Sequence, residues 1–396
     1  MPFLLAQGCE KGTGNGSSNL SWLAAHNIDA MSPQRRTRIF AIVAVIVSAA
    51  LATCAALAIY LLVGRPSYRM LGSLRQARLV RAYLLNPSLR RFARTLAAQD
   101  PKTDLFATLW DIDTGVLLSR HMYRSVTMDG ASKYMYKPNL KKLGFRTGAS
   151  GLRWNMETED TPAIRAALAE LDTPFLVTAA YDERGFRRVD SDLAAGCSAR
   201  ALFLGDSFTD GLWVSDADTF VNVYGRLVRE QSGVRLCPVN GGVNGYGPPE
   251  EAYVLEHYFE EAGRPSVVFV MFFPNDVDAD YDAVVNGTLA DRDRRWHDSL
   301  NQIARIKRFV SGHGATLVLA AIPPAEQVYA HGSQQDYQDV LRAFAEREGI
   351  QFVNLIDRLA APDARMFYWD WDPHFTPLGH RVVANALYDE TERLFK

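Results

Sequence analysis

The sequence has few cysteines, no marked excess of charge of either sign and no internal repeat. Its net charge of −2 over 396 residues lacks the basic excess typical of nucleic-acid-binding proteins, so we expect no nucleic-acid partner. Four cysteines are too few for a disulfide scaffold. Cys197 and Cys237 could pair only if neighbouring strands brought them within about 7 Å of each other. They lie at different distances from the ends of the strands predicted below, and we expect no bridge between them.

One stretch lacks charged residues altogether. Residues 39–63 contain none, and as a helix this run would be about 37 Å long, which is enough to cross a bilayer. It exceeds the roughly 7 to 15 apolar residues of a cleaved signal peptide. The sequence therefore predicts an uncleaved transmembrane helix over 39–63, through which the protein binds a membrane. We expect residues 1–38 to form a disordered N-terminal tail.

Arginines flank this run on both sides. Arg35, Arg36 and Arg38 precede it, and a longer series follows it from Arg65 onward. A count of positive charge alone would place the later residues in the cytoplasm, but long C-terminal domains translocate largely regardless of charge. We therefore expect a single-pass protein of the bacterial inner membrane, with the residues after the span in the periplasm.

From residue 196 onward, short apolar runs alternate with helical periodicity. Parallel strands joined by helices give a three-layer α/β/α domain, which we expect over 196–396. Residues 64–195 have weaker periodicity and are interpreted as a juxtamembrane accessory region, with a helix break at Asn86-Pro87 and a hairpin over 105–120. The predicted strands cover 201–204, 234–239, 267–272, 316–322 and 351–354, and the predicted helices cover 218–231, 249–262, 298–312, 335–348 and 377–394.

A serine follows the first of these strands. Ser207 comes directly after Gly205-Asp206, where the chain must turn from the strand towards a helix. Ligands bind at the carboxyl edge of such a sheet, because the turns and helix N-termini there present N–H groups. A glycine-rich run over 240–247 follows the second strand, and Asn275 follows the third. We therefore expect backbone N–H groups and a side-chain amide beside Ser207.

The last motif of this edge precedes the final helix and reads Asp370-Trp371-Asp372-Pro373-His374. In an extended segment, residues two apart point to the same side, and a proline favours an extended conformation in the residue before it. Asp372 can therefore reach the imidazole of His374. Together with Ser207, these residues match a nucleophile, a base and an orienting carboxylate, beside donors for an oxyanion.

These motifs resemble the sequence blocks of the SGNH (GDSL-like) hydrolase and acyltransferase superfamily, in its membrane-anchored bacterial type. Gly205-Asp206-Ser207 is similar to the first block, Gly245 to the glycine of the second, Asn275-Asp276 to the third and Asp372-Pro373-His374 to the fifth. The resemblance covers about 199–396. It implies a flavodoxin-like parallel α/β fold and no metal or organic cofactor.

The same resemblance implies a catalytic triad of Ser207, His374 and Asp372. It also implies an oxyanion hole formed by the N–H groups of Ser207 and Gly245 and the side chain of Asn275. The sequence departs from the family pattern in two places. Many members place the aspartate three residues before the histidine, whereas here the spacing is two and Asp370 is a competing carboxylate. The third block has proline where the family has glycine before the asparagine.

The expected function is a serine esterase that cleaves acyl esters, acetyl esters above all, through an acyl-enzyme. An O-acyltransferase that modifies cell-surface glycan is the alternative, because a membrane tether raises the concentration of enzyme near membrane-linked glycan. A haloacid-dehalogenase-like phosphatase is a second alternative, because Asp111-Ile112-Asp113 and the run from Asp206 to Asp210 resemble its nucleophile and magnesium motifs. A non-catalytic glycan-binding domain is a third, should Ser207 and His374 lie far apart.

Overall fold

The computed structural model describes residues 85–98, 122–147, 154–194, 196–277, 293–330 and 335–396, with short pieces at 42–44, 47–48, 284–285 and 287. The chain divides into two compact units, Met1–Ser73 and Leu74–Lys396, and every element discussed below belongs to the second. Among the residues so described, no helix is long and apolar enough to cross a membrane. The span predicted over 39–63 lies outside them, except for five residues, and it stays a prediction.

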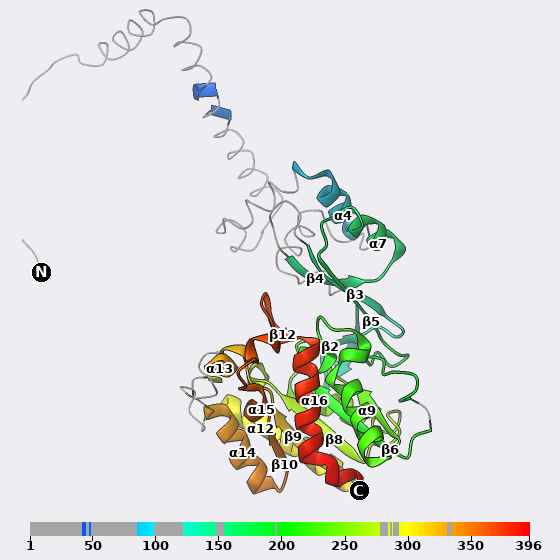
Figure 1. The fold of residues 1–396 in the computed structure, drawn as a ribbon, viewed down its shortest axis with the longest axis vertical. Helices are drawn as coiled ribbons and strands as arrows, with labels where there is room; N and C mark the ends of the chain where they lie inside the picture. The colour runs from blue at the N-terminus through cyan, green and yellow to red at the C-terminus, as the bar shows by residue number, and fades with distance from the viewer. Residues whose placement is uncertain are drawn as a thin grey trace, which may run out of the picture. The chain divides into compact units, whose positions relative to one another are not determined.

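A parallel sheet of five strands forms the centre of the second unit (Figure 1), in the order β10-β9-β8-β6-β7. All five predicted strands and all five predicted helices of this part of the chain are present. The strands are β6 (Ala199–Gly205), β7 (Leu236–Asn240), β8 (Val267–Phe272), β9 (Thr316–Ala321) and β10 (Gln351–Asn354), and the helices are α9 (Phe220–Ser232), α10 (Pro248–Tyr258), α12 (Arg294–Gly312), α14 (Asp336–Glu348) and α16 (Pro377–Thr391). The predicted parallel α/β fold is confirmed.

Helices cover both faces of this sheet. Leu202 and Leu204 of β6 point into a hydrophobic core shared with α10, α12 and α14. Ala201 and Phe203 belong to the core on the opposite face, shared with α9 and α16. Successive side chains of a strand point to opposite faces, so a strand that is covered on both sides needs a continuous apolar run. That requirement explains why the sequence pattern identified these strands.

Shorter elements follow the strands at the carboxyl edge of the sheet. They include a hairpin outside the five-stranded sheet, and the second of its two antiparallel strands carries the Asp-Pro-His motif. These elements are α8 (Ser207–Asp210), α13 (Ala325–Tyr329), α15 (Ile356–Leu359) and the hairpin strands β11 (Tyr368–Trp369) and β12 (Asp372–Phe375).

The accessory region contains antiparallel structure that the sequence did not reveal. A three-stranded sheet has the order β4-β3-β5, and a separate hairpin pairs β1 with β2. The predicted helix break is confirmed, because Asn86 caps a new helix by accepting hydrogen bonds from the N–H groups of Ser88 and Leu89. The hairpin predicted over 105–120 lies outside the described residues. The elements are α4 (Pro87–Ala97), β1 (Tyr123–Met128), β2 (Ala131–Tyr136), β3 (Lys141–Thr147), β4 (Trp154–Glu159), α7 (Pro162–Leu168) and β5 (Phe175–Ala180).

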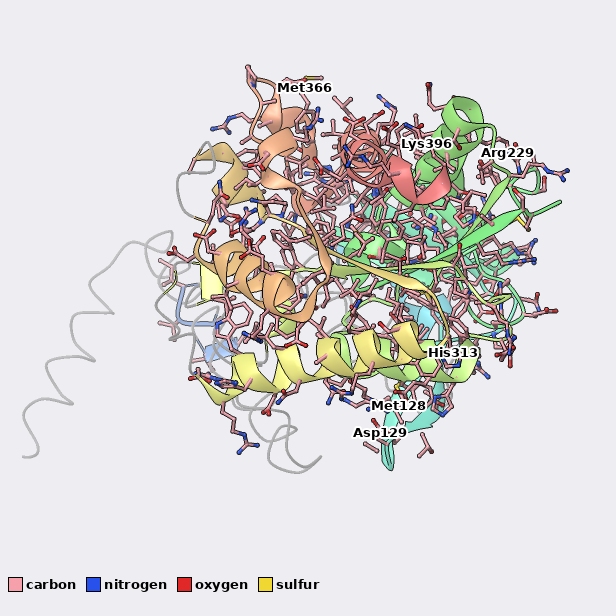
Figure 2. All side chains as sticks on the ribbon, turned by 90° about the horizontal axis from the view of Figure 1, so that it is seen from below. Met128, Asp129, Arg229, His313, Met366 and Lys396 are labelled. Carbon is pink, nitrogen blue, oxygen red and sulfur yellow. A yellow bond between two sulfur atoms is a disulfide. The ribbon has the colours of Figure 1, made fainter. Side chains whose placement is uncertain are left out.

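Ion pairs join the accessory strands to the parallel-sheet part of the unit. At the turn between β1 and β2, Asp129 Oδ2 lies 2.9 Å from Nη1 of Arg305 on α12, and Figure 2 shows this turn beside α12. A second contact is deeply buried. Lys142 of β3 is only 2% exposed, and its Nζ lies 2.7 Å from both Glu157 Oε1 and Asp210 Oδ2. Since Asp210 ends α8, β3 is joined directly to the helix that begins with Ser207.

A disulfide joins Cys197 and Cys237, whose Cα atoms are 5.5 Å apart, so the expectation of no bridge was wrong. The two strands concerned are neighbours, and their register places Ala199 opposite Leu236. The beginnings of β6 and β7 are therefore level, which brings a cysteine just before β6 close to one at the start of β7. Counting from the carboxyl ends of the predicted strands missed this, because β6 has seven residues and β7 only five.

We expect Lys142→Met to destabilise the protein by about 3 to 5 kcal/mol, because it removes the cation that contacts the buried carboxylates of Asp210 and Glu157. The free energy of unfolding, measured by urea denaturation, checks this value. Arg294→Met is the control, because Arg294 pairs with Asp298 at the surface, where an ion pair contributes little. Equal stability of the two variants would contradict the importance of the buried pair.

Candidate active site

Ser207 is the first residue of α8 and follows β6 after a sharp turn. Gly205 has a φ of 154° there, and a Cβ at this position would lie 2.2 Å from Thr209 Oγ1. Only glycine allows so close an approach. Asp206 caps the helix by accepting a hydrogen bond of 2.9 Å from the N–H of Phe208. The turn thus places Ser207 at the carboxyl edge of the central strand, as the sequence predicted.

The β11–β12 hairpin brings the histidine to this serine. Ser207 Oγ lies 2.7 Å from His374 Nε2, and the Nδ1 atom of His374 contacts Asp372 Oδ1. The backbone N–H of His374 also donates to Asp372 Oδ1, at 3.1 Å. With the proton on Nδ1, Nε2 is free to accept a hydrogen bond from the serine hydroxyl. Residues 167 positions apart in the sequence thus form one hydrogen-bonded chain.

Asp370, the other carboxylate that could orient His374, does not contact the imidazole. Its side chain is 88% exposed, and Oδ1 is 3.8 Å from Nη1 of Arg146. It sits at the tip of the hairpin, because Trp369 pairs with Asp372 across the two strands. The structure therefore places Asp372, and not Asp370, against the imidazole.

Gly245 and Asn275 occupy the same edge of the sheet. Asn275 follows β8 in the short 3-10 helix η3 (Pro274–Asp276), and its Nδ2 donates to Asp206 Oδ2 at 3.2 Å. Gly245 follows β7 and has a φ of 77°. Both residues are exposed. The predicted oxyanion donors therefore come from the ends of the two strands that flank β6.

The glycine-rich run also has a packing role. A Cβ at Gly242 would lie 2.3 Å from the backbone N of Asp210. Any side chain at this position would therefore clash with α8, and only glycine lets the run pack against that helix. Asn240 Nδ2 donates to the carbonyl of Thr209 at 2.8 Å. The run therefore supports the helix that begins with Ser207.

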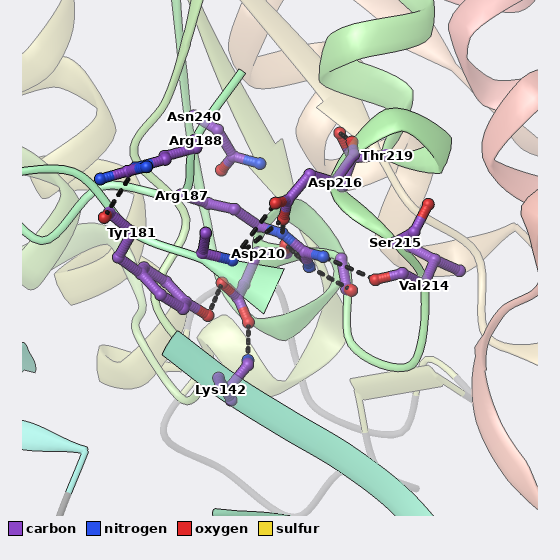
Figure 3. Close-up of polar contacts among 12 residues, drawn as sticks. Lys142, Tyr181, Arg187, Arg188, Asp210, Val214, Ser215, Asp216, Thr219 and Asn240 are labelled. Carbon is purple, nitrogen blue, oxygen red and sulfur yellow. Dashed lines mark hydrogen bonds and ion pairs between the residues drawn. The ribbon is translucent and has the colours of Figure 1, made fainter. Parts of the chain in front are cut away.

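Asp210, at the end of α8, is fully buried and has several partners (Figure 3). Besides Lys142, it accepts hydrogen bonds from the hydroxyl groups of Tyr181 at 2.7 Å and Tyr136 at 3.1 Å. Burial alone would raise the pKa of Asp210, but Lys142 and Arg187 hold that pKa below its ordinary value. Asp210 is therefore a carboxylate in the interior.

Arg187, which follows β5, holds the segment after α8 in place through hydrogen bonds to its carbonyl groups (Figure 3). Its guanidinium donates to the carbonyls of Asp210 and Gly211, each at 2.5 Å, and to that of Val214 at 2.5 Å. Nε donates to Asp216 Oδ1 at 2.9 Å. Only 2% of Arg187 is exposed. Sequence analysis missed these roles of Lys142 and Arg187, since the region before residue 196 gave no clear periodicity.

Two further acids are buried near Asp206. Burial raises the pKa of Glu251 well above its ordinary value, and neighbouring acids add to this effect. Burial likewise raises the pKa of Asp276. Glu251 is 1% exposed, and neither of its carboxylate oxygens has a hydrogen-bond partner among the described residues. Burial therefore favours the neutral form of both acids.

His380 is the other histidine near the site, but it has a structural role. It is buried, and burial lowers its pKa to about 3. Its Nδ1 accepts a hydrogen bond of 3.1 Å from the N–H of Phe220 at the start of α9. His380 is therefore neutral, and its Nδ1 already accepts a hydrogen bond, so it does not compete with His374 for the proton of Ser207.

The phosphatase alternative would need carboxylates that share a metal ion. In the part of the chain that the structure describes, no three His, Cys, Asp or Glu side chains are grouped to hold one. Both oxygens of Asp210 already bind Lys142, Tyr136 or Tyr181. Asp111 and Asp113 lie outside the described residues.

Comparison with known proteins gives the following matches. Residues 203–382 match the model of the GDSL-like lipase/acylhydrolase family, and no curated protein matches the chain. Among solved structures, the chain is similar to LAE5, an alpha/beta hydrolase enzyme from the metagenome of Lake Arreo in Spain. The identity is 23%, over 51% of this chain and 99% of that one, with a TM-score of 0.38.

It is also similar to Axe2, an acetylxylan esterase from Geobacillus stearothermophilus, with 19% identity over 50% of this chain and 95% of that one and a TM-score of 0.37. The segment matched by the family model contains Ser207, Gly245, Asn275 and His374. The matched segment, a little under half of the chain, resembles the GDSL-like lipase/acylhydrolase family, and the protein is a hydrolase that acts on ester bonds.

Proposed function

We propose that this protein is a serine esterase that works through an acyl-enzyme. The observation that carries the proposal is the hydrogen-bonded chain in which Ser207 Oγ is 2.7 Å from His374 Nε2 and His374 Nδ1 contacts Asp372. This is the arrangement by which an imidazole removes the proton of a serine while a carboxylate orients the ring. The proposed reaction uses no metal ion or organic cofactor.

The first half of the reaction forms the acyl-enzyme. Ser207 Oγ attacks the carbonyl carbon of the ester, and its proton passes to His374 Nε2. Asp372 stabilises the imidazolium that forms. The N–H groups of Ser207 and Gly245 and the amide of Asn275 are proposed to stabilise the oxyanion. When the tetrahedral intermediate collapses, the ester C–O bond breaks, and the alcohol leaves with the proton from His374.

The second half removes the acyl group. A water molecule attacks the acyl-serine carbonyl while His374 takes one of its protons. The second tetrahedral intermediate then releases the carboxylic acid, and the proton returns to Ser207 Oγ. If a sugar hydroxyl replaces water, the same steps transfer the acyl group to glycan, which is the O-acyltransferase alternative. Acetyl is the acyl group that we propose to test first.

The disulfide supports the proposed location. Disulfides persist in oxidising compartments such as the periplasm and are rare in the cytosol. The bridge between Cys197 and Cys237 lies in the same unit as Ser207. We therefore propose that residues 39–63 anchor the protein in the bacterial inner membrane and that the catalytic domain is periplasmic.

We expect Ser207→Ala to abolish labelling by a fluorophosphonate probe and to lower kcat on an acetyl ester by about 10⁶-fold, because the nucleophile is lost. Gel fluorescence and a p-nitrophenyl acetate assay measure the two effects. Ser132→Ala, which removes an exposed serine of β2, should label like the wild type. Labelling of Ser207→Ala at the wild-type level would refute the assignment of the nucleophile.

We expect Asp372→Asn to lower kcat by about 10⁴-fold, because an amide at this position favours the wrong tautomer of the histidine. Asp370→Asn should leave kcat on p-nitrophenyl acetate close to the wild-type value, because Asp370 is exposed and does not contact His374. Parallel assays of the two variants test this difference. A larger loss in Asp370→Asn would mean that the two carboxylates have been assigned in the wrong order.

Hydrolysis and transfer can be distinguished by their products. The protein is incubated with an acetyl ester and an oligosaccharide acceptor, and mass spectrometry measures free acetate and acetylated sugar. We expect acetate as the main product, because water is in large excess over any sugar hydroxyl. Acetylated sugar that forms faster than acetate would favour the acyltransferase instead.

A further inference from the structure

Four aromatic side chains gather beside the hairpin that carries Asp372 and His374. The ring centroids of Trp369 and Trp371 are 5.2 Å apart. Phe175 of β5 lies 5.1 Å from Trp369 and 5.4 Å from Trp371, and Trp213 lies 5.5 Å from Trp371. We call these four residues the tryptophan cluster. It combines side chains from the accessory sheet with side chains from the parallel-sheet part of the unit.

The cluster borders both halves of the active site. In the hairpin, Trp369 pairs directly with Asp372, and Trp371 precedes Asp372 in the chain. On the serine side, Trp213 follows the turn in which the N–H of Leu212 donates to the carbonyl of Ser207 at 3.0 Å. A group bound at the cluster would therefore lie next to an ester held at Ser207.

Three members of the cluster are less buried than the aromatic residues of the core, whereas Trp213 is buried. Phe203 and Phe269, for example, are fully buried between the sheet and its helices. In contrast, Phe175, Trp369 and Trp371 each remain partly exposed. The partial exposure leaves aromatic surface for contact with a ligand.

Charged groups border this aromatic surface. The Cζ atom of Arg146 lies 4.9 Å from the ring centroid of Trp371, and the exposed carboxylate of Asp370 projects from the tip of the hairpin. The cluster therefore offers aromatic rings together with one strong hydrogen-bond acceptor and one strong donor.

This combination fits a sugar ring. A pyranose presents C–H groups on its faces, which pack against the electron-rich face of an aromatic ring, and hydroxyl groups at its edge, which bond to carboxylate and guanidinium groups. A long acyl chain would use only the apolar surface and would form no hydrogen bond with Asp370 or Arg146. We propose that the tryptophan cluster is a subsite for a sugar ring of an O-acylated carbohydrate, whose ester is cleaved at Ser207. This inference rests on the proposed esterase function.

The test compares two kinds of acetyl ester. The wild type and Trp371→Ala are assayed on p-nitrophenyl acetate and on O-acetylated oligosaccharides built on glucose, xylose or N-acetylglucosamine. We expect the variant to lose about 10-fold more kcat/KM on at least one oligosaccharide than on the small ester, mainly through KM, because it loses an aromatic contact. Met366→Ala, which removes an exposed apolar side chain outside the cluster, should keep the wild-type ratio.

Several results would overturn this proposal. An equal loss on both kinds of ester would mean that Trp371 only supports the hairpin. An unchanged ratio on every oligosaccharide would exclude the subsite, and a selective loss on p-nitrophenyl octanoate would assign the cluster to the acyl chain. If the wild type fails to cleave p-nitrophenyl acetate and fails to react with a fluorophosphonate, the proposed esterase function itself is wrong, which is a separate result.

Discussion

The order of the five parallel strands is the constraint on which the site depends. β7 lies on one side of β6, and β8 lies on the other, so the connections from β6 and β7 run in opposite directions along the sheet. Such a switch point opens a crevice at the carboxyl ends of the strands. Ser207 and Asn275 stand at the ends of β6 and β8, and the hairpin adds His374 from outside the sheet.

The buried carboxylate of Asp210 imposes a second requirement. A charge in the interior is tolerated only when it is paired and hydrogen-bonded, and here Lys142, Tyr136 and Tyr181 supply those contacts. All three come from the region before β6. The accessory strands therefore hold α8 by its last residue while the β6 turn holds it by its first. This arrangement restricts the movement of Ser207 relative to the sheet.

Sequence reasoning succeeded where the physical signal is local. Apolar runs identified the parallel strands, and the two-residue spacing of Asp372 and His374 predicted their contact. The roles of these residues in a catalytic triad stay proposals. It failed where partners are distant in the chain. The antiparallel accessory strands β1 and β5, with only part of their surface buried, lack continuous apolar runs. The contact of Lys142 with Asp210 and the Cys197–Cys237 bridge each join segments that are distant in the chain, and a local pattern gives no sign of which distant segments meet.

The network around Asp210 also limits where the chain of this enzyme can be truncated without loss of the fold. The family match begins at residue 203, which suggests that the earlier residues could be removed. A fragment that began there would lack Lys142 and Arg187, so Asp210 would keep a buried charge without a cation, and the carbonyls of Gly211 and Val214 would lose the hydrogen bonds from the guanidinium group. Such uncompensated groups are costly. The boundary of the family is therefore not a boundary of folding, and substitutions in the accessory strands and in the serine motif must remain compatible with each other.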